Sequence, residues 1–190
     1  MNARRLSQAI SEGDGISVIA AVAGADAARA AEDAGAEALV AHGDHALAEI
    51  RAATELPLLV YLRDDRASAP EGVDACIVEV RDDDRERLDR LRRDLGGRFE
   101  LAPRICTDEH LAFVLEELDP EVLVLGSDDD DSLAGALELL PDVPAGKLAI
   151  ADVGARTREE VVELERAGMD GVIVAAGEIA HLVGSAPPEV

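Results

Sequence analysis

Polar side chains stand at the ends of several short apolar segments of this 190-residue chain. Tyr61 and Asp152 lie near the ends of two such segments, and Glu79 and Arg104 each lie within another. If the segments are parallel strands covered by helices, their carboxyl ends meet at one edge, where such folds place their chemistry. A phenol, two carboxylates and a guanidinium at one edge could transfer protons or hold an anion. The same edge would receive the other polar residues at segment ends: His42, Asp44, Arg63, Asp64, Arg81, Cys106, Ser127 and Asp128.

Glu79 and Arg104 are the most unusual of these residues, because each places a charge within an otherwise apolar run. A charge that is removed from water needs a partner of opposite sign. We therefore expect Glu79 and Arg104 to pair at this edge, with Asp152 and Tyr61 as further members of the cluster. Such a cluster is either an altered acid–base or anion site, or a structural ion pair that closes the edge, and we favour the structural pair.

Two other groups of residues could suggest a metal site. His42, Asp44 and His45 lie close together, but this spacing in a loop lacks the helical i, i+4 geometry of a strong metal motif. The acidic run 128–131 could bind Mg²⁺ or Ca²⁺, yet it lacks the glycine and the distal glutamate of a calcium loop. A polar loop and an acidic helix start are the simpler interpretations. We predict no metal and no cofactor.

The two cysteines, Cys76 and Cys106, are too few and too far apart to indicate a disulfide framework or a zinc site. Cys106 follows an apolar segment and could act as a nucleophile. Because the sequence offers no evident histidine partner for it, we favour a buried, small, apolar role.

A helix end, a tight turn, an acidic residue and a short apolar run recur at 32–41, 116–125 and 165–174. An apolar run of this length is typical of a strand that is buried on both faces of a parallel sheet. The same pattern, followed along the chain, predicts eight strands that alternate with helices: 16–22, 38–41, 58–62, 75–80, 100–105, 122–125, 148–153 and 171–174.

Eight such units predict an α/β fold, a compact (β/α)₈ barrel that spans 1–190 as one domain with short loops. A helix at 1–12 would lead into the barrel, and 184–190 would form a tail. The helix that follows the third strand should be short or missing, because 63–72 is polar and contains Pro70. A doubly wound open sheet is the alternative, but the expected glycine-rich loop after the first strand is not there.

The chain carries a net charge of −23, which argues against nucleic acid and anionic membranes as partners. No apolar run approaches the ~18 residues of a membrane span, and the first residues do not form a signal peptide. We expect a cytoplasmic monomer or small homo-oligomer. The arginine-rich, alanine-rich composition is typical of a GC-rich genome, such as that of a thermophile or a halophile.

Five segments carry a resemblance to a known family: 19–22 (IAAV), 31–38 (AEDAGAEA), 56–59 (LPLL), 151–161 (ADVGARTREEV) and 167–174 (AGMDGVIV). They resemble the motifs I-A-E-V-K, Y-E-x-A-G-A-x-A, L-P-V-L-R-K-D-F, E-S-G-I-x-T-x-E-D-V and G-x-D-A-V-L-V-G of indole-3-glycerol-phosphate synthase. The resemblance implies a phosphate-binding TIM barrel and a carbon–carbon lyase of tryptophan biosynthesis. The last segment is also similar to thiamine-phosphate synthase and the pentulose-phosphate epimerases.

The departures from this family fall on its chemistry. Its first-strand glutamate and lysine correspond to Ala21 and Ala23, and its third-strand lysine corresponds to Tyr61. Its fifth-strand glutamate corresponds to Arg104, and its seventh-strand E-S-G becomes Asp152-Val153-Gly154. Decarboxylation with ring closure needs a proton donor and cationic groups, which these replacements remove. The resemblance therefore implies a catalytically silent or diverged relative.

A phosphate site is the part of the family's machinery that these departures leave in place. Such barrels bind phosphate on backbone N–H groups after the seventh and eighth strands. The resemblance places Gly154 in the first of these loops, and Ala175, Ala176 and Gly177 in the second. Glu178 counts against an anion there, and the small residues would also suit close contact of a helix with a strand.

These residues are compatible with three functions. The first is a diverged or silent barrel that binds a small phosphorylated ligand. The second is an active lyase or isomerase of the phosphate-barrel superfamily, which uses Tyr61, Glu79, Arg104 and Asp152. The third is a structural barrel without a ligand.

Overall fold

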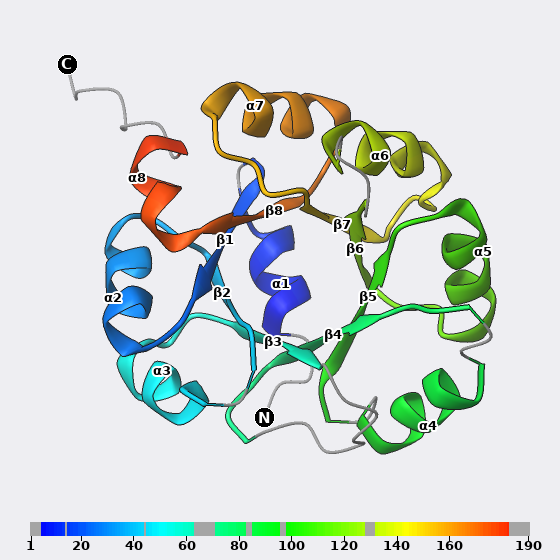
Figure 1. Ribbon diagram of the computed structural model, residues 1–190, viewed down its shortest axis with the longest axis horizontal. Helices are drawn as coiled ribbons and strands as arrows, with labels where there is room; N and C mark the ends of the chain where they lie inside the picture. The colour runs from blue at the N-terminus through cyan, green and yellow to red at the C-terminus, as the bar shows by residue number, and fades with distance from the viewer. Residues whose placement is uncertain are drawn as a thin grey trace.

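Eight parallel strands close into a barrel in the order β1 to β8, as predicted (Figure 1). The computed structural model describes residues 5–13, 15–43, 45–62, 71–82, 85–95, 98–127 and 132–182. β1 pairs with both β2 and β8, so the ring has no edge and the open sheet is excluded. The strands are β1 Ser17–Val22, β2 Ala38–Ala41, β3 Leu58–Leu62, β4 Ala75–Glu79, β5 Glu100–Ile105, β6 Val122–Gly126, β7 Leu148–Asp152 and β8 Gly171–Ala175.

The helices α2 to α8 surround the ring of strands, whereas α1 lies within its outline when viewed as in Figure 1. The bounds of the strands agree with the predicted ranges to within one residue. The predictions for 63–70, the acidic run 128–131 and the tail 184–190 lie outside the described residues. The helices are α1 Arg5–Ser11, α2 Ala25–Asp33, α3 Leu47–Ala53, α4 Arg85–Leu95, α5 Asp108–Glu117, α6 Ser132–Leu139, α7 Arg158–Ala167 and α8 Ile179–Leu182, with short 3₁₀ turns η1 Leu140–Asp142 and η2 Ala176–Glu178.

The apolar strands serve two separate cores, because alternate side chains of a strand point to opposite faces. One set fills the barrel and includes Ile19, Val40, Leu59 and Ile77. The other set lies between the strands and the surrounding helices and includes Leu39, which neighbours Val40 on β2. This double burial explains why the strand sequences are apolar without alternation.

Local sequence signals set the ends of α7 and α2. α7 begins with a capping box, in which the Thr157 side chain accepts from the backbone N–H of Glu160 and the Glu160 carboxylate accepts from that of Thr157. The backbone N–H groups of Arg156 and Thr157, which both donate to the Glu160 carboxylate, lower the pKa of Glu160. Gly168 and Gly35 follow α7 and α2 with φ of 104° and 95°, a conformation that favours glycine.

α1 closes the amino end of the barrel. Its Leu6 and Ile10 are buried among the residues that fill the barrel interior. The buried Glu100 carboxylate, at the start of β5, accepts from the backbone N–H of Leu6 at 2.8 Å and of Ser7 at 3.2 Å. These N–H groups belong to the first described turn of α1, the part of a helix whose N–H groups need acceptors from outside it. The leading helix is therefore a built-in plug, so the open mouth of the barrel is at the carboxyl ends of the strands.

Within the described part of the chain, no helix combines the length and apolarity that a membrane crossing requires.

Candidate functional site

Three of the four predicted polar residues meet across the mouth of the barrel. The Tyr61 hydroxyl donates to Asp152 Oδ2 at 2.7 Å, and Arg104 Nε donates to the same oxygen at 2.9 Å. These side chains come from β3, β5 and β7, alternate strands whose inward residues share layers in such barrels. Because β3 and β7 face each other across the ring, the cluster spans the mouth. We call Tyr61, Arg104 and Asp152 the mouth network.

The mouth network is largely shielded from water. The Arg104 and Asp152 side chains are 16% and 24% exposed. Burial raises the pKa of the Tyr61 phenol far above its usual range, and the neighbouring Asp152 carboxylate raises it further. The phenol therefore stays protonated at any working pH and acts as a hydrogen-bond donor. The Tyr61 phenol and the Arg104 guanidinium thus both hold the Asp152 carboxylate in place.

Arg104 fits into the mouth because Gly126, at the end of β6, has no side chain. A Cβ at Gly126 would lie 2.9 Å from Arg104 Nη2 and 3.2 Å from the backbone oxygen of Asp152. Arg104 Nη1 also lies 2.9 Å from Cys106 Sγ. Neither contact was predicted from the sequence. The presence of a glycine where an apolar strand ends is the signal that would have indicated the first of them.

The prediction that Glu79 and Arg104 form a pair is wrong. The two residues are Cα partners on β4 and β5, but the Glu79 side chain is 54% exposed and lies 3.5 Å from Arg81. Glu79 is the last residue of its strand, where water solvates the carboxylate, and Arg104 turns instead to Asp152. The inclusion of Asp152 and Tyr61 in the cluster is confirmed.

The expected burial of Cys106 is also wrong, since this residue is partly exposed at the mouth and contacts Arg104. Cys76 is the fully buried cysteine, and burial raises the pKa of its thiol to about 12. The two sites therefore offer very different access to a thiol reagent.

We expect a disulfide reagent such as Ellman's reagent to modify one thiol of the native protein, Cys106, at about pH 8. Cys76 should react only after unfolding, because its thiol is buried and protonated. The measurement is the number of thiolate equivalents released before and after denaturant is added. The Cys106→Ser variant should show no rapid phase. A rapid phase that survives this substitution would contradict the assignment.

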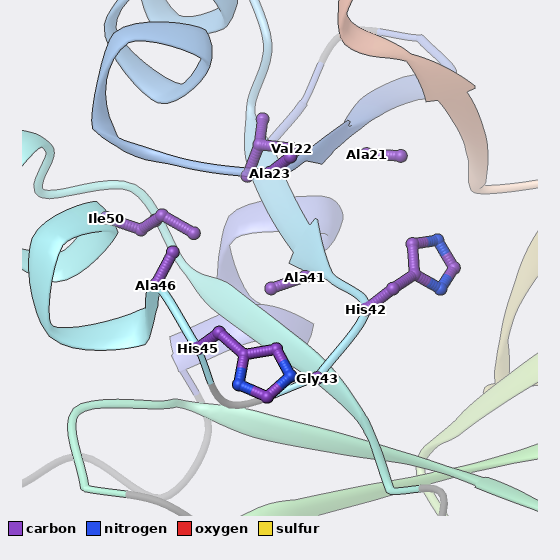
Figure 2. Close-up of a pocket in the computed structure, with 9 residues that line it drawn as sticks. All are labelled: Ala21, Val22, Ala23, Ala41, His42, Gly43, His45, Ala46 and Ile50. Carbon is purple, nitrogen blue, oxygen red and sulfur yellow. The ribbon is translucent and has the colours of Figure 1, made fainter.

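His42 and His45 line a cleft of about 330 Å³ beside the mouth network (Figure 2). The His42 ring stacks on the Tyr61 ring, with centroids 4.6 Å apart and planes at 8°. Asp44, the third residue of the considered metal group, lies outside the described residues. Among those that are described, no group of three or more metal-binding side chains comes together.

The four residues predicted to bind phosphate lie on the neighbouring strands β7 and β8 or directly after them. Gly154 is exposed, with φ of +64°, and nothing lies within 4 Å of a Cβ built on it. Ala175 is the exposed last residue of β8, and Ala176 and Gly177 continue into η2. Gly177 is likewise open. Glu178 ends the same turn, and its carboxylate counts against an anion there.

The remaining candidates at strand ends do not join the mouth network through the contacts described. Arg81 lies beside Glu79, and Ser127 faces α6, with its Cβ 2.7 Å from where a Cβ of Gly135 would stand. Arg63, Asp64 and Asp128 lie outside the described residues.

A comparison of the chain with protein-family models gave no match, and a comparison with curated protein sequences gave none either. The closed barrel is therefore assigned on its own geometry, and the likeness to one synthase family stays a resemblance of motifs. What the mouth can do follows from its residues.

Proposed function

We propose that this protein is a diverged phosphate-barrel relative that binds a small phosphorylated ligand and does not catalyse the synthase reaction. The phosphate lies on the backbone of Gly154 and of Ala175–Gly177. The mouth network forms a fixed polar wall beside it. The mouth network holds its own three side chains in place and transfers no proton in a reaction.

The observation that carries this proposal is the uneven division of the mouth. Tyr61, Arg104 and Asp152 link β3, β5 and β7 across the mouth. On the side of β8 and β1, the paired residues Ala175 and Ala21 present only methyl groups. Small exposed residues allow a ligand to approach backbone N–H groups, which is how these barrels bind phosphate without a cationic side chain.

The loss of the synthase reaction follows from the same residues. Ala21 and Ala23 offer neither a carboxylate nor an ammonium at the end of β1. Tyr61 stays protonated next to Asp152 and is a weak acid at neutral pH. Glu79, the other candidate acid, lies with Arg81 and outside the mouth network, which argues against the active lyase or isomerase.

A thermal-shift screen of phosphorylated metabolites, with indole-3-glycerol phosphate and inorganic phosphate included, tests the proposal. A ligand at about 100 times its Kd should stabilise the fold by about 2.7 kcal/mol. For a chain of this size, that corresponds to a rise in Tm of roughly 5–10 °C.

Gly177 provides a matched pair of variants for this screen, since a Cβ meets nothing there and its backbone is not strained. Gly177→Asp places a carboxylate at the cradle and should abolish the shift. Gly177→Ala should keep most of it. A shift that both variants retain would place the ligand elsewhere.

The second candidate is a structural barrel without a ligand. It is favoured by one observation, namely that an ion pair and a phenol already cross the mouth. If no phosphorylated compound shifts Tm, this candidate replaces the first.

A further inference from the structure

The ends of β8 and β1 form one continuous surface at the mouth of the barrel. Ala175, the last residue of β8, is the Cα partner of Ala21 on β1. Each lies two positions after a residue of the barrel interior, Ile173 and Ile19, so by alternation both face inward. The turn η2, which continues the proposed phosphate loop, contacts β1. Because paired residues of neighbouring strands lie about 4.8 Å apart, Ala21 directly adjoins the loop that would hold the phosphate.

Ala21 also lines the cleft beside the mouth (Figure 2). The cleft lies over the ends of β1 and β2 and beside the start of α3, and its volume is about 330 Å³. That volume is at the lower end of the range for small-molecule sites. Since Ala21 belongs to both surfaces, the cleft continues the phosphate side of the mouth and is not a separate site.

The wall of the cleft on the side of α3 is aliphatic. Val22 and Ala41 at the strand ends and Ile50 of α3 belong to the core between strands and helices. Ala46, directly before α3, packs against the same core and lines the cleft beside them. Methylene groups gain free energy when they leave water against such a wall, whereas hydroxyl groups lose hydrogen bonds to water.

The His42 ring borders the cleft but is turned away from this wall. It stacks on Tyr61, with ring centroids 4.6 Å apart, and Figure 2 shows it on the side opposite α3. The Tyr61 hydroxyl is in turn bonded to Asp152, so the mouth network holds the ring in that direction. A group that extends from the phosphate loop over Ala21 therefore reaches the aliphatic wall and not the imidazole.

We propose that the ligand of the phosphate site is a monoester with a short aliphatic body. The phosphate lies on the loop after β8, and the alkyl chain crosses Ala21 and enters the cleft against Ala46 and Ile50. This inference rests on the proposed function and names its class of ligand. The protein selects alkyl phosphates over polyhydroxylated phosphate esters of the same length.

Calorimetric titration with butyl phosphate, methyl phosphate and glycerol 3-phosphate tests this selection. Butyl phosphate should bind at least about tenfold more tightly than either of the others. Methyl phosphate lacks the body, and glycerol 3-phosphate, which is of similar length, places hydroxyl groups against the aliphatic wall. Saturable binding of all three with equal affinity would overturn this inference and leave the proposed function standing. No saturable binding of any of them at millimolar concentration would overturn both.

Four variants locate the alkyl chain and the phosphate separately. Ala46→Leu fills the cleft on the side of α3 and should lower the affinity for butyl phosphate to that of methyl phosphate, whose own affinity stays unchanged. Ala23→Leu fills it from an exposed position after β1 and serves if the first variant does not fold. Ala112→Leu, at an exposed alanine of α5 that does not line the cleft, should change neither affinity. Gly177→Asp should weaken both esters alike.

The two levels of the account fail in different ways in these variants. A preference for butyl phosphate that survives both cleft-filling variants would overturn the aliphatic subsite alone. Binding of both esters that survives Gly177→Asp would place the phosphate elsewhere and overturn the proposed function as well.

Discussion

Replacement of Arg104 by methionine is expected to lower the free energy of unfolding by about 2–4 kcal/mol. The substitution leaves the Asp152 carboxylate, which is 24% exposed, without its cationic partner. A charge that is mostly removed from water and loses its partner is destabilising even where the intact pair contributes little. Urea denaturation at neutral pH, followed by far-UV circular dichroism, measures the change.

Arg81→Met provides the matched control, since Arg81 also lies beyond a strand end but its contact with Glu79 is half exposed. Its effect should stay below about 0.5 kcal/mol. The combined change Tyr61→Phe, Arg104→Met and Asp152→Leu removes every polar member of the mouth network and should recover most of the loss. If Arg104→Met is as mild as Arg81→Met, the mouth network contributes nothing to stability.

Replacement of Leu6 by alanine is expected to lower the free energy of unfolding by about 2–4 kcal/mol. Leu6 is fully buried, and its backbone N–H is bonded to the buried Glu100 carboxylate. The smaller side chain leaves a cavity at the closed end of the barrel, which the surrounding strands cannot collapse to fill. Chemical denaturation gives the free energy, and hydrogen exchange of the Leu6 and Ser7 amides reports directly on whether α1 stays docked.

Gln8→Ala is the control on the same helix, because Gln8 is exposed and forms a side-chain contact with Glu12 within its own turn. It should change stability by less than about 0.5 kcal/mol. Rapid amide exchange at Leu6 in the native protein would refute the view of α1 as a plug.

The strands of the barrel could be predicted from the sequence because local signals and burial agree in them. Each of the segments 38–41, 58–62 and 100–105 is a strand with the predicted bounds. Such runs are buried on both faces, so their composition alone indicates the element. The capping box at Thr157 and the glycine turn at Gly168 are equally local, since their partners lie within five residues along the chain.

The mouth could be predicted only in part, because its contacts join residues that are far apart in the chain. The strand ends bring Tyr61, Arg104 and Asp152 together, as the order of units implies. Arg104 pairs with Asp152 and not with Glu79 because of the length of its side chain and the space left by Gly126. Neither can be obtained from the spacing of residues along one strand. The bond from Glu100 to α1, 94 positions away, is missed for the same reason.

Isothermal titration calorimetry with indole-3-glycerol phosphate, on the native protein and on Gly177→Asp, tests the proposed binding function most directly. We expect saturable binding to the native protein with one site, weakened at least about tenfold by the added carboxylate. Gly177→Ala should stay close to the native value. Binding of equal strength to the native protein and Gly177→Asp, or no binding to either, would contradict a phosphate site at Gly154 and Ala175–Gly177.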